Sequence, residues 1–240
     1  MYQTALATPC KMRKANVLLS VLSADDAALL APHLQSVDLT REMRLERRGR
    51  AAEFVYFIEG GVAVTIADDA RGHGVEICMT GCEGLVGVGA VLGAERSAYD
   101  VQMLTAGTAR RIAAADLRQA MDASATLRQA ILAYVHAFTL QVMREAQTNA
   151  RMTLEARLAR WLLMMHDRIE GDDLHLTHDR LATMLGVRRA GVSVAAKKLE
   201  RSGVLTLHRG SIVIQDRALL EEASAGAYGA ADRMAVEAAG

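Results

Sequence analysis

The sequence contains few aromatic residues, prolines and cysteines. Aromatic residues make up 4% of the 240 residues, and there are only 2 prolines and 3 cysteines. Cys10, Cys78 and Cys82 are odd in number and irregularly spaced, so they do not predict a disulfide framework, which fits a reducing cytoplasm. No apolar run reaches the ~20 residues of a membrane span. The first apolar stretch soon meets Asp25 and Asp26, which makes a poor signal peptide. We therefore expect a cytoplasmic protein with no membrane partner.

A net charge is also missing, because 28 Lys and Arg balance 28 Asp and Glu. The charge is nevertheless uneven along the chain. Residues 177–210 hold seven cations and two anions, a net charge of +5, whereas residues 211–240 have a net charge of −3. A polyanion responds to local charge. Residues 177–210 therefore favour a nucleic acid as partner.

Hydrophobic patterning divides the chain into three parts, residues 1–115, 116–150 and 151–240. In the first part, Ser23 is a candidate N-cap of a short helix within residues 16–34. The β-branched and aromatic stretch "EFVYFIEGGVAVTIADD" then predicts two strands joined by a turn at Gly60–Gly61. Short strands with glycines between them continue to about residue 112. This pattern predicts an antiparallel β-roll of the jelly-roll type, so the fold class is α+β.

Residues 116–150 contain no glycine or proline and predict one long helix. Its apolar residues recur at spacings of three and four. Such a stripe must be covered, either by the β-roll of the same chain or by the same helix of a second chain, and the two can coexist. We favour a homodimer. The predicted dimer interface comprises Leu127, Ile131, Tyr134, Val135, Phe138 and Val142.

The stretch "THDRLATMLGVRRAGVSVAAKKLERSGVL" predicts a helix-turn-helix. Thr177 is a candidate N-cap, and Gly186 supplies the sharp turn. The following "LTLHRGSIVI" predicts a hairpin, or wing, around Arg209–Gly210. On the second helix, arginine suits guanine and lysine suits phosphate. The alternative is a solvated basic helix in an ordinary bundle. The candidate DNA-binding residues are Thr177, Arg188, Arg189, Ser193, Lys197, His208 and Arg209.

The order of these parts resembles the bacterial Crp/Fnr family of transcriptional regulators over roughly residues 16–216. "YFIEGGVAVTI" resembles the early β-roll hairpin of that family. "EGLVGVGAVLGAERSA" resembles its phosphate-binding cassette, which ends in Arg-Ser, here Arg96 and Ser97. The resemblance implies a homodimer that binds a two-fold symmetric double-stranded DNA operator. It also implies a small effector that shifts an on/off equilibrium, and contact with RNA polymerase if the protein is an activator.

The effector is left open by departures from the family pattern. Cyclic-AMP binders carry Gly-Glu in the cassette, whereas here Gly87 is followed by Val88, which cannot accept a hydrogen bond from a ribose hydroxyl. The family's purine-contacting Thr-Ser pair corresponds to Val142 and Met143. We therefore expect an effector other than cyclic AMP: another nucleotide such as a cyclic dinucleotide, another small molecule, or none. The candidate ligand residues are Gly87, Val88, Arg96, Ser97, Val142 and Met143, although Arg96 could instead serve as a surface ion-pair partner.

The recognition helix departs from the family as well. Members that read the best-known operator carry Arg-Glu-x-x-x-Arg, where this chain has "RAGVSV" from Arg189 to Val194. DNA binding is still implied, but with a different operator. Gly191 costs about 1 kcal/mol of helix stability relative to alanine. A close approach of another backbone or of DNA would explain it.

Metal, haem and enzyme chemistry have weaker support. The cysteines do not match the family's iron–sulfur spacing, so Cys78 and Cys82 are interpreted as core thiols, with one oxidation-sensing thiol left open. His166, His175 and His178 are interpreted as surface histidines rather than metal ligands. Haem ligation through His73 or Cys78 is a further alternative.

No catalytic motif appears, so we expect that the protein is not an enzyme. We expect no bound metal and assign no cofactor. The rival function is a nucleotide-sensing module whose helical end contacts protein rather than DNA.

Overall fold

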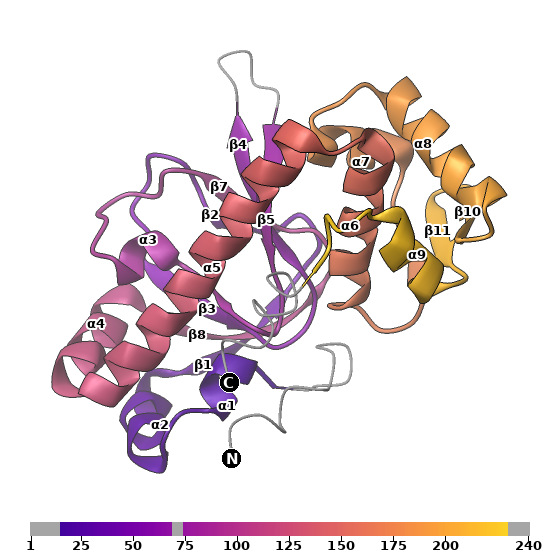
Figure 1. The fold of residues 1–240 in the computed structure, drawn as a ribbon. Coiled ribbons are helices and arrows are strands. Elements are labelled where there is room, and N and C mark those ends of the chain that lie inside the picture. The colour runs from indigo at the N-terminus through magenta and orange to yellow at the C-terminus, as the bar shows by residue number, and fades with distance from the viewer. Residues whose placement is uncertain (1–14, 69–73, 230–240) are drawn as a thin grey trace.

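The structure, a computed structural model, describes residues 15–68 and 74–229. Figure 1 shows an N-terminal part rich in strands, a long helix that runs across it, and a helical C-terminal part at its side. The predicted α+β fold class is confirmed. None of the helices within these ranges is long and apolar enough to cross a membrane. The sequence predictions on Cys10, His73 and the tail from residue 230 lie outside the described residues.

Two four-stranded antiparallel sheets form the predicted β-roll, with strand orders β1-β8-β3-β6 and β2-β7-β4-β5. Buried residues from both sheets, such as Ile58 and Met103, make up one hydrophobic cluster. The turn at Gly60–Gly61 is present, but β3 and β4 on either side of it belong to different sheets. The expected hairpin is therefore a crossover between the two sheets. The strands are β1 (Gln35–Leu39), β2 (Arg44–Glu46), β3 (Phe54–Ile58), β4 (Ala63–Asp68), β5 (Gly74–Thr80), β6 (Leu85–Val86), β7 (Asp100–Met103) and β8 (Gly107–Ala113).

The helices before and after the roll begin at capping serines. Ser23 caps α2, as predicted, because its hydroxyl accepts a hydrogen bond from the Asp26 N–H at 3.1 Å. The single helix expected over residues 116–150 is instead two helices, which break at Ser124. Ser124 adopts extended backbone angles and caps the second helix, and its hydroxyl donates to Asp26 Oδ1 at 2.5 Å. These helices are α1 (Val17–Ser20), α2 (Ala24–Leu30), η3 (Ala31–His33), α3 (Val88–Val91), α4 (Ala114–Ala123) and α5 (Ala125–Arg151).

The predicted apolar stripe of α5 packs largely on its own β-roll. Leu127, Ile131 and Tyr134 are at most 3% exposed and share a cluster with β3, β6 and α4. The Tyr134 hydroxyl also donates to the Leu85 carbonyl oxygen at 3.0 Å. Their own chain already covers these three residues of the predicted dimer interface. Val135, Phe138 and Val142 are half-buried.

The C-terminal part is docked on the β-roll. Its hydrophobic core continues into the roll, because Val62, Val64 and Met79 belong to the same buried cluster. Arg168 and Glu83 form an ion pair of 2.8 Å, and both side chains are at most 2% exposed. The elements of this part are α6 (Leu154–His166), β9 (Asp173–Leu174), α7 (His178–Leu185), α8 (Arg189–Arg201), β10 (Leu205–His208), β11 (Ser211–Ile214) and α9 (Arg217–Ala223).

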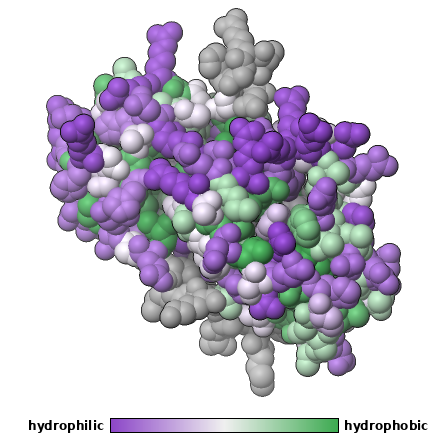
Figure 2. All heavy atoms as spheres, turned by 180° about the vertical axis from the view of Figure 1, so that it is seen from behind, coloured by the Kyte–Doolittle hydropathy of each residue, from purple (hydrophilic) through white to green (hydrophobic). Residues whose placement is uncertain are grey.

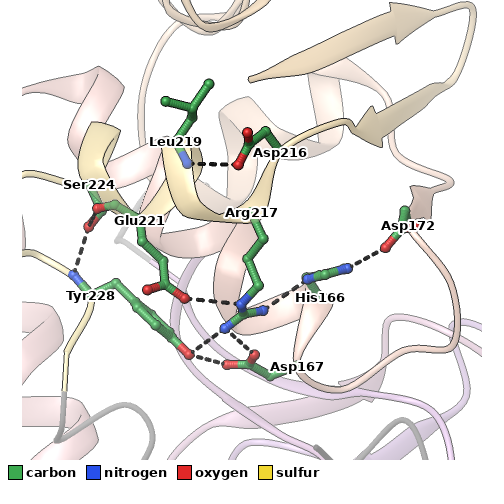
Figure 3. A network of polar contacts seen from close by, with 9 residues as sticks. All are labelled: His166, Asp167, Asp172, Asp216, Arg217, Leu219, Glu221, Ser224 and Tyr228. Atoms are coloured by element: carbon green, nitrogen blue, oxygen red, sulfur yellow. Dashed lines mark hydrogen bonds and ion pairs between the residues drawn. The ribbon is translucent and has the colours of Figure 1, made fainter. Parts of the chain in front are cut away.

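A polar network fixes the chain after α9 to the end of α6 (Figure 3). Arg217 lies at its centre, with Nη2 2.8 Å from Asp167 Oδ1 and 2.9 Å from the Tyr228 hydroxyl. Arg217 Nη1 lies 2.9 Å from His166 Nδ1. Because arginine can only donate, this ring nitrogen accepts, and His166 Nε2 donates to Asp172 Oδ1 at 2.7 Å. The network thus holds the residues that follow α9 against the core.

The two described cysteines differ from each other. Cys78 is a buried free thiol, as predicted, and burial raises its pKa to about 12. Cys82 is buried and disulfide-bonded, so its interpretation as a core thiol was wrong.

Candidate nucleic-acid interface and effector cavity

Helix α7 begins and ends at the residues that the sequence predicted. The Thr177 hydroxyl accepts a hydrogen bond from the Arg180 N–H at 3.2 Å. Gly186 ends the helix with a φ of 62°, which glycine adopts without a steric penalty. A Cβ on Gly186 would lie 3.2 Å from Val75 Cγ2 of β5. The turn of the helix-turn-helix therefore also fits closely against the β-roll.

Helix α8 has one buried side and one exposed side. Val192, Ala195 and Leu199 are buried, as predicted. Arg189 and Lys197 are exposed, and Ser193 is half-exposed. Arg188 is the exposed N-cap residue. Four of the seven residues that we predicted to contact DNA therefore lie at the start of α8 or away from its core.

Two of these side chains have partners on α7. Arg189 Nε lies 3.4 Å from Asp179 Oδ1, and each of these side chains is 68% exposed. An exposed ion pair contributes at most about 1 kcal/mol, so Arg189 can leave Asp179 for another anion or acceptor at little cost. Ser193 Oγ lies 3.0 Å from His178 Nδ1, which ties α8 to α7.

The wing is the predicted hairpin. Strands β10 and β11 pair from Leu205–Ile214 to His208–Ser211, and β9 adds a third strand. His208 and Arg209 are exposed at its tip. In Figure 1 the wing lies beside α8 at the outer edge of the molecule, so both elements are accessible from the same side.

Further exposed residues on α8 were missed from the sequence. These are Ala190, Val194, Lys198 and Arg201. Helical spacing from Lys197 would have found Ala190, Val194 and Arg201, since they precede or follow it by seven, three and four residues. Lys198 is held by Glu155 of α6, with 2.6 Å between Nζ and Oε2.

Gly191 is explained by helix packing. A Cβ at this position would lie 3.1 Å from Leu154 Cδ2 at the start of α6. Such a contact is tighter than ordinary packing, so glycine lets the two helices approach. Within the chain, the close neighbour is a side chain rather than a backbone.

A cavity of about 200 Å³ lies beside the cassette in the β-roll. Four of the predicted ligand residues line it: Gly87, Val88, Arg96 and Ser97. Val142 and Met143 are not among its described lining residues, and Met143 is 63% exposed. Phe138 lines the cavity from the same helix instead.

The two polar cassette residues of the cavity have partners within the protein. Ser97 Oγ lies 2.5 Å from Glu46 Oε2 and 2.8 Å from the Tyr99 carbonyl oxygen, so its hydroxyl already has partners. Arg96 Nη1 donates instead to the Gly49 carbonyl oxygen at 2.8 Å. Burial raises the pKa of Glu46, although the contact with Ser97 opposes this. A phosphate bound to Ser97 would displace the Glu46 carboxyl. When that carboxyl is ionised, it would also repel the phosphate.

The histidines are held by protein partners. His166 belongs to the network around Arg217 and is 3% exposed, so its interpretation as a surface histidine was wrong. His178 contacts Ser193. His175 Nδ1 lies 3.9 Å from Asp173 Oδ1. Within residues 15–68 and 74–229, no group of three or more His, Cys, Asp or Glu side chains could hold a metal ion.

A β-roll, a long helix and a winged helix-turn-helix with a basic outer face together define a DNA-binding regulator fold. Comparison with known proteins agrees. Residues 156–223 match the family of Crp-like helix-turn-helix domains. The sequence matches no curated protein. The chain therefore contains a Crp-like helix-turn-helix domain, and the resemblance to Crp/Fnr regulators predicted from the sequence is confirmed.

Solved structures share the whole architecture. A protein assigned to the Crp/Fnr regulators from Eubacterium rectale is 16% identical, with a TM-score of 0.70 over 87% of this chain and 98% of that chain. The c-di-GMP-responsive global regulator CLP of Xanthomonas campestris is 19% identical, with a TM-score of 0.65 over 81% of this chain and 100% of that chain. A CooA mutant from Carboxydothermus hydrogenoformans is 14% identical, with a TM-score of 0.62 over 91% of this chain and 100% of that chain. At these identities the likeness shows the fold.

Proposed function

We propose that the protein is a transcriptional regulator that binds double-stranded DNA through α8 and the wing. The observation that carries this proposal is the outer face of α8, where Arg188, Arg189, Lys197 and Arg201 are all exposed. Cations that neutralise phosphates release condensed counterions and make binding depend steeply on salt. Arginine can in addition bind guanine O6 and N7 in the major groove.

The proposed regulator acts as a homodimer whose contact runs along a second stripe of α5. Leu132, Val135, Thr139, Val142 and Ala146 follow spacings of three and four, the heptad spacing of a coiled coil. Leu132 is 43% exposed, which is unusual for a leucine unless something else covers it. Two subunits joined along this stripe would place their α8 helices in successive major grooves, about 34 Å apart.

The proposed effector is not a cyclic nucleotide bound through Arg96 and Ser97. The support is the contact between Ser97 and Glu46, together with Val88, which offers no acceptor to a ribose hydroxyl. The cavity of about 200 Å³ beside these residues is the site that we propose for a small-molecule effector. A ligand can regulate the protein only through different affinities for its DNA-competent and DNA-incompetent states.

The test is fluorescence anisotropy on the intergenic duplex upstream of the protein's own gene, at two salt concentrations. Each titration is repeated with cyclic AMP, cyclic GMP and cyclic di-GMP. We expect salt-sensitive binding that no nucleotide changes. Binding without salt dependence would contradict the DNA-binding proposal and favour a protein-contact module. Binding that appears or vanishes with one nucleotide would contradict only the effector proposal.

A further inference from the structure

The exposed face of α8 carries an apolar residue, Val194, among cations. A helix turns roughly 100° per residue, so Ala190, Val194, Lys197 and Arg201 project within one narrow sector. This sector lies opposite the buried Val192, Ala195 and Leu199. Val194 is 69% exposed, the highest value among the exposed large hydrophobic residues in the described part of the chain.

The surroundings of Val194 are those of a polar surface. Figure 2, the view from behind, shows mainly hydrophilic side chains at the side formed by the C-terminal part, with hydrophobic ones scattered between them. Lys197 and Arg201 flank Val194 on the same face and are exposed. Valine is also a weaker helix former than alanine, so an exposed valine here gives no local advantage in stability.

Cations and Val194 would meet different groups of a duplex. Lys197 and Arg201 suit phosphates, which carry no sequence information directly. Val194 has no donor or acceptor, and the apolar group that base pairs present in the major groove is the C5-methyl of thymine. Ala190, one turn earlier on the same face, is small and leaves room for a base edge to approach.

We propose that Val194 determines operator specificity by contact with a thymine methyl group. This inference rests on the proposed DNA-binding function and deepens it. Because the proposed dimer is two-fold symmetric, each half-site carries one such thymine at equivalent positions. The operator therefore requires a T·A pair at the position that Val194 contacts. An arginine at the same position of α8 would instead favour a G·C pair.

The test begins with selection of duplexes from a random pool by the full-length protein. Each thymine of the selected site is then replaced by deoxyuridine, which removes only the methyl group. Burial of one methyl corresponds to a loss of about fourfold in affinity. We expect such a loss at one position per half-site, and about fifteenfold when both are replaced.

Val194→Ala supplies the decisive comparison, because an exposed alanine preserves the helix. In this variant, the preference for thymine over deoxyuridine at that position should fall well below fourfold. Lys197→Ala is the matched control: it should weaken all duplexes yet keep the fourfold preference for thymine. A thymine preference that survives undiminished in Val194→Ala, or no methyl preference in the unmodified protein, would overturn the inference while leaving the proposed function intact. Failure to select any sequence would instead count against the proposed function.

Discussion

Glu76 of β5 gives the contact between the β-roll and the C-terminal part a predictable pH dependence. Glu76 is 6% exposed, and its Oε2 accepts a hydrogen bond from Trp161 Nε1 of α6 at 3.1 Å. Burial raises the pKa of Glu76 to about 8. The hydrogen bond from Trp161 and the positive charges of Arg168 and Arg180 oppose this shift, whereas the negative charge of Glu145 adds to it. The folded protein therefore holds Glu76 protonated at neutral pH.

The sign of the pH effect follows from linkage between proton binding and folding. In the unfolded chain Glu76 has its ordinary pKa of about 4.5, so it loses its proton there first. Its contribution to stability is greatest below pH ~4.5, declines as the pH rises, and levels off above pH ~8. At about 1.4 kcal/mol per pH unit, the loss between pH ~5 and pH ~7 amounts to roughly 2–3 kcal/mol.

Glu76→Gln isolates this contribution, because the amide resembles the protonated carboxyl in shape and can still accept from Trp161. Urea unfolding of both proteins is followed by fluorescence of Trp161, the single tryptophan of the chain. We expect nearly equal stability at pH ~5, and a variant more stable by roughly 2–3 kcal/mol relative to that baseline at pH ~7. A difference between the two proteins that does not change with pH would refute the argument, because Glu76 would then ionise alike in the folded and unfolded states.

Three further predictions concern binding, assembly and folding. Arg189→Ala should cost about 1–3 kcal/mol in anisotropy titrations on the operator and relax specificity at one base pair. Lys197→Ala should weaken binding to all DNA sequences alike and flatten its salt dependence. An equal loss of binding on all sequences for Arg189→Ala would contradict the role of Arg189 in base contact. In sedimentation, Leu132→Asp should yield monomers while Leu219→Asp, a comparably exposed leucine of α9, should not. Gly186→Ala should lower the free energy of unfolding by about 1–2 kcal/mol, since alanine is strained at a φ of 62°; no measurable change would contradict the strain argument.

The helix-turn-helix was predictable from the sequence because local rules determine it. A cap at Thr177, a glycine with positive φ at Gly186 and the buried spacing of α8 each depend on neighbours along the chain. The break at Ser124 was harder to predict. It combines a helix cap with hydrogen bonds to Asp26, a partner about 100 residues earlier, and helical periodicity does not reveal such a contact.

The apolar stripes of α5 show where periodicity alone misleads. Helix α5 carries two apolar stripes, and the more hydrophobic one, which includes Leu127 and Ile131, is used inside the chain. The weaker one, which includes Leu132, stays partly exposed and is the stripe that we propose for the dimer contact. Burial of the more hydrophobic stripe removes more apolar area from water. That stripe is therefore the one expected to pack inside its own domain. A sequence pattern ranks stripes by hydrophobicity but does not show which surface covers each of them.

For the cavity, the sequence revealed the cassette motif but did not reveal the hydrogen-bond partners of its residues. Arg96 and Ser97 remain in the sequence, and both line the cavity. Glu46 alters the chemistry around these two residues. It lies about 50 residues earlier in the chain, at the end of β2, where the register of β2 with β7 shifts. Ser97 contacts this carboxyl, so one of the two residues that resemble a phosphate site already has a partner within the chain. A ligand that donates a hydrogen bond to Glu46 fits this arrangement better than an anion does, so a search for the effector should begin with small molecules that lack a phosphate.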